Sequence, residues 1–313
     1  MEASTEIQRV AVVGTGVIGA SWAACFLAYG LDVVATDPAP GAEEALGRYV
    51  ATAWRALETF GLAPGASLSR LRFTADLKQA LAGADLVQEN GPEREAFKIK
   101  LFADMDAIVP PLTILASSSS GITMSVIQSR CTHPERCVIG HPFTPPHLMP
   151  LVEVVGGRGT SAETIQRVMR FYKTLGKHAI LIRKEVMGHV ANRLQAALYR
   201  EMVHLIDQDV VSVADVDAAV TLGPGLRWGL MGPNLLYHLG GGPGGMRHFL
   251  EQFSGPMTAW WADLGSPNIA RPELQKKIVD GVAQEVAGRS FETLAEKRDA
   301  LLIGLLELRA RHE

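Results

Sequence analysis

Two ionisable residues, His141 and Glu153, stand in or beside apolar runs of the sequence. Glu153 interrupts the run LVEVV, which otherwise predicts a buried strand, and His141 directly follows the apolar run CVIG. Burying a lone carboxylate is costly, so Glu153 should have a partner. Histidine accepts protons near neutral pH, and a carboxylate on its far ring nitrogen fixes the tautomer. The pair therefore predicts a general base of the kind that removes the hydroxyl proton of a secondary alcohol.

A glycine-rich turn lies in the N-terminal segment VAVVGTGVIGASWAACFLAYGLDVVATD, between an apolar run and an amphipathic one. Gly14 allows a tight turn, Gly16 lets the backbone approach a pyrophosphate, and Gly19 permits a helix to pack closely on a strand. Val17 and Ile18 lie between the last two glycines and belong to the same predicted cofactor turn. The pattern predicts dinucleotide binding at a helix N-terminus.

The acidic residue that should follow such a turn is Asp37, which ends the second apolar run eighteen residues beyond Gly19. A carboxylate at this place accepts hydrogen bonds from the ribose of NAD and repels the 2′-phosphate of NADP. No arginine follows it directly. The predicted cofactor is therefore NAD.

A metal site is the weaker alternative for part of this sequence. Cys131, His133, Cys137 and His141 form a C-x-H-x3-C-x3-H pattern, but these spacings differ from those of the usual zinc sites. We therefore predict no metal. The chain has three cysteines, with Cys25 as the third, and no secretion signal, so the thiols are expected to be reduced.

Strand-like and helical segments alternate through the first half of the chain, and these elements must position the chemistry. Strand-like runs cover residues 9–14, 31–37, 84–90, 112–118, 136–140, 151–155 and 178–183. Amphipathic segments cover residues 17–29, 42–60, 94–108 and 161–175. The alternation predicts an α/β fold, a Rossmann-type, doubly wound and mostly parallel sheet with helices on both faces. The carboxyl ends of its strands would gather the glycine turn and the His–Glu pair at one edge.

The second half of the chain is predicted to be helical. Residues 186–210 have apolar positions at helical spacing, and Ser212 and Gly223 are a predicted N-cap and stop for the next helix. We therefore predict a NAD-binding Rossmann domain over residues 1–185. A smaller all-helical domain for substrate binding and dimerisation follows over residues 186–313.

The composition is typical of a globular enzyme. The 313 residues are 47% hydrophobic and 20% charged, with a net charge of −3. This charge favours neither a nucleic-acid nor an anionic-membrane partner. No apolar run reaches the ~18 residues that a transmembrane helix needs, and the N-terminus lacks the pattern of a signal peptide. The predicted location is the cytoplasm.

Several motifs together resemble the L-3-hydroxyacyl-CoA dehydrogenase family over nearly the whole chain. They are VAVVGTGVIGASWA, ASSSSGI, GHPFTPP, LVEVVGG and KEVMGHVANRL, in the family's order and spacing. The resemblance implies that His141 and Glu153 form the catalytic pair. It also implies that Ser120 contacts the substrate oxygen, that Asn192 helps to hold the substrate, and that the protein is a homodimer.

The resemblance also extends to the cofactor site. It implies that Glu93 and Lys98 lie near the nicotinamide ribose, and Ser118 and Thr144 are assigned to the same site. Thr144 stands where the family has asparagine. A second departure lies in the segment Met187–Gly188–His189. Met187 stands where the family has proline, and His189 stands where it has phenylalanine. Both departures bear on substrate fit rather than on the reaction.

The substrate is suggested by two further segments. Residues 41–67 contain none of the lysines with which CoA-using members grip the nucleotide tail of CoA. Residues 223–256 resemble a side branch that includes L-gulonate 3-dehydrogenase, lambda-crystallin and L-carnitine dehydrogenase. The likeness to the carnitine enzymes is strongest, which implies oxidation of L-carnitine to 3-dehydrocarnitine. The alternatives are L-gulonate, a short L-3-hydroxyacyl-CoA, or a crystallin-like protein that binds NAD without turnover.

A free 3-hydroxy acid needs a cation for its carboxylate, and Arg227 is the candidate. The trimethylammonium of carnitine would be held by cation–π contact with aromatic faces. Candidates for that contact are Phe143, Trp228, Phe253, Trp260 and Trp261.

Overall fold

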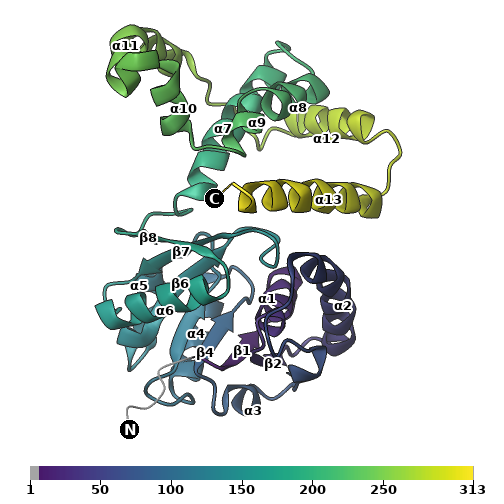
Figure 1. Cartoon of the computed structure of the whole chain (residues 1–313), viewed down its shortest axis with the longest axis vertical. Helices are drawn as coiled ribbons and strands as arrows, with labels where there is room; N and C mark the ends of the chain where they lie inside the picture. Colours follow the sequence, from purple (N-terminus) through teal and green to yellow (C-terminus); the bar gives the residue numbers. More distant parts are fainter. Residues whose placement is uncertain (1–6, 313) are drawn as a thin grey trace. The chain divides into compact units, whose positions relative to one another are not determined.

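The computed structural model describes residues 7–312, which form two compact units that divide after Arg193 (Figure 1). The first unit contains the sheet and its helices, and the second is helical. The domain boundary predicted after residue 185 lies in the segment that joins the last strand to the helix α7 (Ala191–Asp207).

The first unit is built on an eight-stranded sheet in the order β3-β2-β1-β4-β5-β6-β7-β8. The strands are β1 (Arg9–Val13), β2 (Asp32–Thr36), β3 (Leu71–Phe73), β4 (Leu86–Glu89), β5 (Ile114–Ser117), β6 (Cys137–Pro142), β7 (Leu151–Gly156) and β8 (His178–Ile182). Neighbouring strands are parallel except β6 and β7, so β7 and β8 run opposite to the other six. The predicted fold class is confirmed.

Helices cover both faces of this sheet. They are α1 (Val17–Ala28), α2 (Ala42–Phe60), α3 (Leu77–Leu81), α4 (Glu95–Asp106), α5 (Met124–Ile127) and α6 (Ala162–Thr174), with short 3-10 turns at Leu68–Arg70, Gln128–Arg130 and Pro134–Arg136. One core joins α1, α2 and α6 to the sheet, and a second core joins α3, α4 and α5 to the opposite face. Alternate residues of β1 enter the two cores, since Val10 and Val12 lie in the first and Ala11 and Val13 in the second. In the first core the ring of Trp22 stacks on Phe26 with centroids 5.2 Å apart.

Two elements differ from the sequence prediction. The edge strand β3 was not predicted, because three residues are too short to show strand alternation. The helix predicted over residues 186–210 begins only at Ala191. Gly188 and His189 have φ angles of 76° and 49°, and two consecutive left-handed residues cannot belong to a right-handed helix. The chain therefore turns before α7 starts.

The second unit continues from α7 with further helices. They are α8 (Val213–Leu222), α9 (Pro224–Trp228), α10 (Pro233–Gly240), the 3-10 turn Gly242–Gly244, α11 (Gly245–Asp263), α12 (Pro272–Val286) and α13 (Phe291–Ala310). Ser212 caps α8 by accepting a hydrogen bond from the N–H of Asp215, and Gly223 follows its last residue, as predicted. A small core of Ile206, Val213 and Val216 joins α7 to α8.

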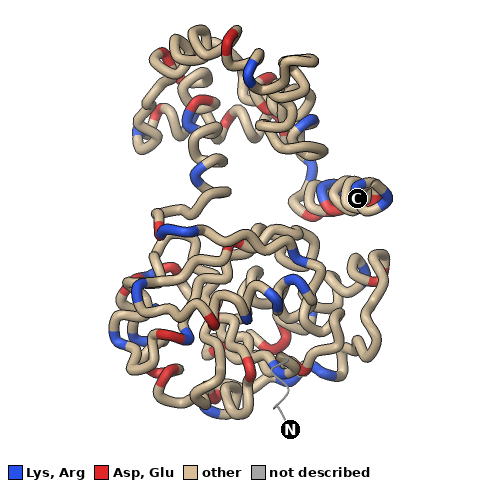
Figure 2. The backbone as a smooth tube through the Cα atoms, turned by 60° about the vertical axis from the view of Figure 1, so that its left-hand side comes forward, with Lys and Arg blue, Asp and Glu red and all other residues tan. Residues whose placement is uncertain are grey.

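Charged residues of both signs are interspersed along the backbone of both units (Figure 2). Within residues 7–312, no helix has the length and apolar character needed to cross a membrane.

Candidate active site

His141 and Glu153 face each other on neighbouring strands. They are directly opposite in the antiparallel ladder between β6 and β7, so their side chains project from the same face of the sheet. His141 Nδ1 is 2.8 Å from Glu153 Oε2, and both side chains are buried. Eight residues, 143–150, join the two strands, which is too few for a parallel crossover and dictates the reversal of β7. The sequence prediction that the two residues reach each other agrees with this geometry.

The second oxygen of Glu153 is also paired. Oε1 accepts hydrogen bonds from the backbone N–H groups of Val190 at 2.9 Å and Ala191 at 3.0 Å. Burial alone would raise the pKa of Glu153, but the hydrogen bonds from His141 and from these two N–H groups outweigh it. The net pKa of Glu153 is lowered, so the carboxylate stays ionised at neutral pH.

The charge on Glu153 fixes the tautomer of His141. A carboxylate only accepts hydrogen bonds, so the Nδ1 of His141 must donate the proton and Nε2 presents its lone pair. The hydroxyl of Ser120 lies 3.1 Å from that Nε2. In the neutral imidazole this arrangement places the Nε2 lone pair beside a hydroxyl group, which suits proton removal from an alcohol.

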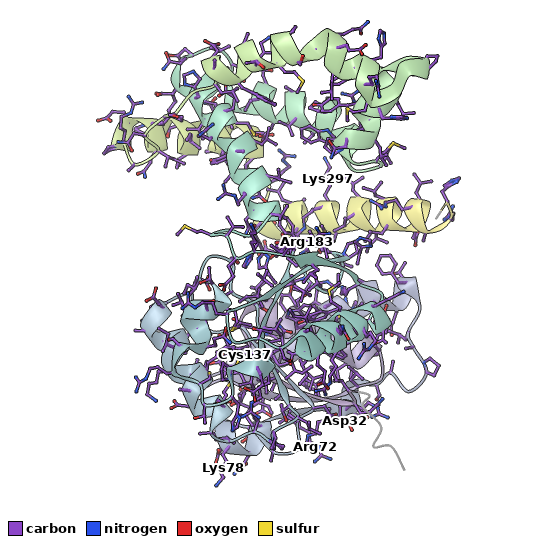
Figure 3. The ribbon with its side chains drawn as sticks, turned by 90° about the vertical axis from the view of Figure 1, so that its left-hand side faces the viewer. Asp32, Arg72, Lys78, Cys137, Arg183 and Lys297 are labelled. Carbon is purple, nitrogen blue, oxygen red and sulfur yellow. The ribbon has the colours of Figure 1, made fainter. Side chains whose placement is uncertain are left out.

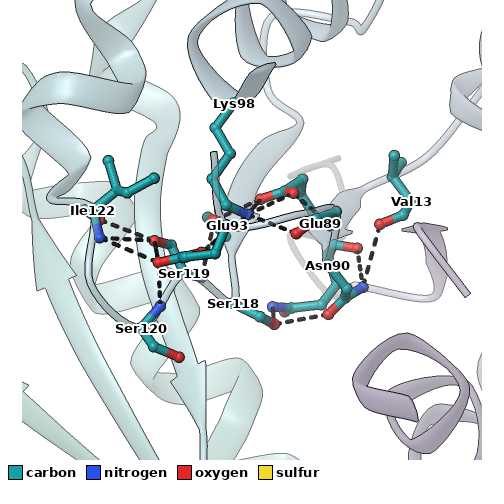
Figure 4. Close-up of polar contacts among 12 residues, drawn as sticks. Val13, Glu89, Asn90, Glu93, Lys98, Ser118, Ser119, Ser120 and Ile122 are labelled. Atoms are coloured by element: carbon teal, nitrogen blue, oxygen red, sulfur yellow. Dashed lines mark hydrogen bonds and ion pairs between the residues drawn. The ribbon is translucent and has the colours of Figure 1, made fainter. Parts of the chain in front are cut away.

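Glu93 organises the backbone around Ser120 (Figure 4). Its Oε1 accepts hydrogen bonds from the N–H groups of Ser120 at 3.0 Å, Gly121 at 2.7 Å and Ile122 at 3.2 Å, and from the hydroxyl of Ser119 at 2.7 Å. Burial favours a higher pKa for Glu93, but these hydrogen bonds and a nearby lysine lower it overall. One ionised carboxylate thus holds the turn that carries Ser120.

Lys98 forms a buried ion pair with Glu89. Its Nζ donates to Glu89 at 2.8 and 2.9 Å and to the carbonyl of Gly91 at 3.2 Å, which accounts for its three N–H groups. The hydroxyl of Ser117 donates to Glu89 at 2.6 Å, while Glu93 lies farther from Nζ at 3.7 Å. Lys98, predicted to contact the cofactor, is 1% exposed and its ammonium is already occupied inside the protein.

Ser118, also predicted at the cofactor, is the centre of a second network. Its hydroxyl donates to Asn90 at 2.8 Å and accepts from Gln88 at 2.8 Å and from the indole N–H of Trp22 at 3.3 Å. Tyr172 in turn donates to Gln88 at 2.7 Å. A hydroxyl has one donor and two acceptor positions, so the side chain of Ser118 has none left for a ligand.

The glycine turn has the shape that the sequence predicts. Gly14 has a φ of 86°, and a Cβ there would lie 2.9 Å from the backbone of Asn90. A Cβ on Gly19 would lie 1.9 Å from the carbonyl of Gly14, so no larger residue fits. Around Gly16, by contrast, a Cβ would meet nothing within 4 Å. Val17 begins α1, and the open backbone at its N-terminus fits the approach of a pyrophosphate.

Asp37 is held beside this turn. Its Oδ2 accepts hydrogen bonds from the N–H of Thr15 at 2.8 Å and from the Thr15 hydroxyl at 3.3 Å, and Oδ1 accepts from the N–H of Ala39 at 2.9 Å. These bonds orient the carboxylate and leave one lone pair on Oδ1 for a ribose hydroxyl. The residues therefore fit a dinucleotide such as NAD.

The other predicted site residues lie in both units. In the first unit, Phe143 and Thr144 follow β6 directly, and Asn192 is the second residue of α7. In the second unit, Arg227 and Trp228 end α9, and Phe253, Trp260 and Trp261 belong to α11. The ring of Phe253 stacks on Phe249 with centroids 5.0 Å apart.

The four residues of the alternative metal pattern do not converge. Cys137 lies inside the first unit, with its Sγ 3.9 Å from that of Cys131 (Figure 3). His133 instead contacts Glu135 at 3.2 Å, and His141 contacts Glu153. Among the described residues, no group of three or more His, Cys, Asp and Glu side chains is arranged to hold a metal ion.

Sequence reasoning missed the supporting polar residues of β4. Gln88 and Glu89 end a strand that is otherwise apolar and are fully buried, and Asn90 directly follows it. They form the two networks around the serine run 117–120. The signal was present in the sequence, because LVQEN contains the same kind of polar interruption that drew attention to Glu153.

Two protein-family models match this chain. Residues 9–186 match the model of the 3-hydroxyacyl-CoA dehydrogenase NAD binding domain, and residues 188–285 match the model of the C-terminal domain of 3-hydroxyacyl-CoA dehydrogenase. The two models cover most of the chain in order. The predictions of an NAD cofactor and of an oxidoreductase acting on a secondary alcohol are thereby confirmed.

Individual relatives cover almost the whole chain. An L-carnitine dehydrogenase of Bacillus cereus is 48% identical over 302 residues, which are 96% of this chain and 92% of that protein. The L-carnitine dehydrogenase of Streptomyces griseus subsp. griseus is 47% identical over 309 residues, 99% of this chain and 92% of that protein. A solved structure of 5-formyl-3-hydroxy-2-methylpyridine 4-carboxylic acid 5-dehydrogenase, described as an NAD+ dependent dismutase, superposes with a TM-score of 0.85 at 30% identity, covering 97% of this chain and 99% of that one. The chain belongs to the 3-hydroxyacyl-CoA dehydrogenase family, and within it resembles the L-carnitine dehydrogenases.

Proposed function

We propose that this protein oxidises the 3-hydroxyl of L-carnitine to give 3-dehydrocarnitine, with NAD as the cofactor. Support for the substrate comes from L-carnitine dehydrogenases that are 42–48% identical over 96–100% of the chain. Support for the reaction comes from one geometric observation. The Nε2 lone pair of His141 faces Ser120, while Nδ1 is fixed by an ionised Glu153.

In the proposed mechanism, His141 Nε2 takes the proton of the substrate hydroxyl. Bound NAD supplies the acceptor for the hydride that leaves carbon 3, so the C–OH group becomes a ketone. Glu153 keeps the imidazole in the correct tautomer and stabilises the imidazolium that forms. Ser120 and Asn192 position the substrate oxygen, and Ser120 is already within hydrogen-bond distance of His141.

The proposed cofactor residues act in two ways. Those that contact NAD are Gly14, Gly16, Val17, Ile18, Gly19, Asp37, Glu93 and Thr144. Lys98 and Ser118 act indirectly, because their side-chain polar groups are already used within the protein. Lys98 neutralises the buried charge of Glu89. Ser118 links the serine run to the end of β4 through its hydrogen bond to Asn90.

For the substrate, we propose that Arg227 binds the carboxylate and that aromatic rings hold the trimethylammonium. Trp228 adjoins Arg227 and has 37% of its surface exposed, so its ring has an accessible face. Phe143 lies two residues from His141, and Phe253 is 38% exposed. Neutral aromatic faces attract a quaternary ammonium that has no N–H group to donate.

We also propose that the protein is a homodimer formed through its helical unit. Large apolar side chains are unusually exposed there, including Leu222 at 78%, Trp261 at 66% and Phe291 at 79%. Exposed apolar surface of this kind is typical of a protein interface. A cytoplasmic location remains a prediction from the sequence.

The test is the rate of NADH formation with NAD and five substrates. These are L-carnitine, D-carnitine, L-gulonate, L-3-hydroxybutyrate and L-3-hydroxybutyryl-CoA. We expect turnover of L-carnitine, and a loss of about 10²–10⁴-fold in kcat for His141→Ala with NAD binding retained. The matched control is His133→Ala, which removes an exposed histidine that also contacts a glutamate.

Each other result excludes part of the proposal. Turnover of the CoA ester or of L-gulonate alone would leave His141 as the base but refute the carnitine assignment. NAD binding without turnover of any compound would favour the non-catalytic alternative. Full activity of His141→Ala would refute the mechanism itself.

A further inference from the structure

A second histidine lies beside the proposed base. The ring of His189 is 5.1 Å from that of His141, centroid to centroid, and only 1% of the residue is exposed. His189 adopts a left-handed conformation with φ 49°, which only a few per cent of non-glycine residues adopt. Such strain at a buried position near chemistry suggests that the conformation serves a purpose.

The contacts of His189 fix its protonation. Nε2 lies 2.9 Å from the carbonyl oxygen of Ser119, and a carbonyl only accepts hydrogen bonds, so Nε2 is the protonated nitrogen. Nδ1 is buried and has no hydrogen-bond partner among the described residues. Burial is the largest influence and lowers the pKa of His189. The hydrogen bond to Ser119 raises it, His141 lowers it, and Glu153 and Glu93 raise it, with a net lowering. The ring is therefore a neutral imidazole with its proton on Nε2.

The turn that contains His189 reaches both partners of His141. The side chain of His189 holds the carbonyl of Ser119, the residue directly before Ser120. The next two N–H groups, of Val190 and Ala191, donate to Glu153 Oε1. The left-handed conformation at residue 189 allows one short turn to direct its side chain to the serine run and its N–H groups to the carboxylate.

We propose that His189 is a positioning residue that couples the Ser120 turn to the Glu153 turn and so sets the geometry of both groups about His141. The inference deepens the proposed function and rests on His141 acting as the base. Its essential group is the Nε2–H donor. The Nδ1 side of the ring contributes shape alone.

Three substitutions separate the two nitrogens of the ring. In His189→Gln the amide nitrogen can take the place of Nε2 and donate to Ser119. In His189→Asn the shorter amide reaches only the position of Nδ1, although asparagine tolerates the left-handed conformation better. His189→Phe keeps an aromatic ring and has no donor.

We expect His189→Gln to keep kcat within about threefold of the wild type, and His189→Asn and His189→Phe to lose about tenfold or more, a loss equivalent to one hydrogen bond. The KM for NAD should change little in all three, since the glycine turn is elsewhere. Thermal midpoints of the variants distinguish this from a general loss of folding. Wild-type kcat in His189→Phe, or better rescue by asparagine than by glutamine, would overturn the proposal.

A second measurement does not depend on the substrate. In nitrogen-15 NMR of the histidine rings at neutral pH, the signal that disappears in His189→Gln identifies His189, and it should be that of a neutral ring protonated on Nε2. An imidazolium or an Nδ1-protonated ring at this residue would contradict the inference even if L-carnitine is oxidised. The expected tautomer in a protein that oxidises none of the five compounds would instead refute the proposed function and leave the hydrogen bond to Ser119 in place.

Discussion

At the scale of single residues, the carboxylate of Glu153 directs all of its observed hydrogen bonds toward the base and the turn before α7. Glu153→Gln keeps the size of the side chain but removes its charge. The amide can present N–H toward His141 Nδ1, which reverses the tautomer and protonates Nε2. We expect kcat to fall about 10²–10⁴-fold, measured as NADH formation at saturating substrate.

The chain offers a matched control for this substitution. Glu135 contacts His133 at 3.2 Å, but both side chains are about half exposed. Exposed pairs of this kind contribute little, so Glu135→Gln should leave kcat unchanged. Equal effects of the two substitutions would mean that Glu153 has only a structural role.

Asp37 permits a prediction on cofactor choice. Its two carboxylate oxygens accept from the N–H groups of Thr15 and Ala39, so Asp37→Asn removes the charge and leaves one of these N–H groups opposite the amide nitrogen. We expect the KM for NAD to rise about tenfold, or about 1.4 kcal/mol, and the KM for NADP to fall. Steady-state kinetics with both cofactors measures the change.

The control for Asp37 is Asp104→Asn, at an exposed aspartate paired with Lys100 on α4. It removes the same charge away from the glycine turn. An unchanged preference for NAD in Asp37→Asn would show that the carboxylate does not contact the ribose.

The contrast between Glu153 and Lys98 shows which residue roles can be predicted from the sequence. Glu153 was recognisable because a charge inside an apolar strand requires a partner, and strand neighbours limit the choice of partner. Lys98 and Ser118 were assigned to the cofactor through the resemblance, and their saturation by Glu89, Gln88 and Asn90 depends on tertiary contacts. No local pattern encodes how many hydrogen bonds a side chain has already made.

At the scale of elements, the loop 143–150 between β6 and β7 is stabilised by a buried lysine from another part of the first unit. Lys177, which precedes β8, donates to the carbonyls of Pro146 at 2.5 Å and Met149 at 3.1 Å. Lys177→Met keeps the length of the side chain but leaves both carbonyls without this donor. We expect the free energy of unfolding to fall by about 1–3 kcal/mol, measured by urea denaturation.

The comparison for Lys177 is Lys173→Met, near the exposed end of α6. A surface change of this type should alter stability by no more than about 0.5 kcal/mol. If both variants unfold at the same urea concentration as the wild type, the buried ammonium does not stabilise the loop.

Element positions were largely predictable where the sequence is periodic. The predicted helix 42–60 coincides with α2, because a long amphipathic run is a strong local signal. The direction of β7 was not specified, since strand patterns are the same in both directions. The delayed start of α7 was missed for a different reason, because apolar spacing does not reveal that Gly188 and His189 adopt left-handed conformations, which a right-handed helix cannot include.

At the scale of the whole molecule, the exposed apolar residues of the helical unit predict association. Sedimentation should detect a particle of two 33.7 kDa chains. Leu222→Glu places a charge on a side chain that is 78% exposed in the single chain. If this residue lies in the dimer interface, the dissociation constant should rise at least about tenfold.

Leu112→Glu is the corresponding control, since Leu112 is 74% exposed but lies in the first unit. It should leave the sedimentation coefficient unchanged. A monomeric wild type at micromolar concentration would exclude the proposed dimer outright.

The hairpin of β6 and β7 has a consequence for how new specificities could arise. Main-chain pairing between β6 and β7 sets the separation of His141 and Glu153, and no side chain of the loop 143–150 takes part in that pairing. Insertions or substitutions in that loop that leave the strand pairing intact would therefore remodel the surroundings of the imidazole while His141 and Glu153 keep their spacing. In evolution or in protein engineering, the specificity for the alcohol could therefore change while the group proposed to remove its proton stays the same.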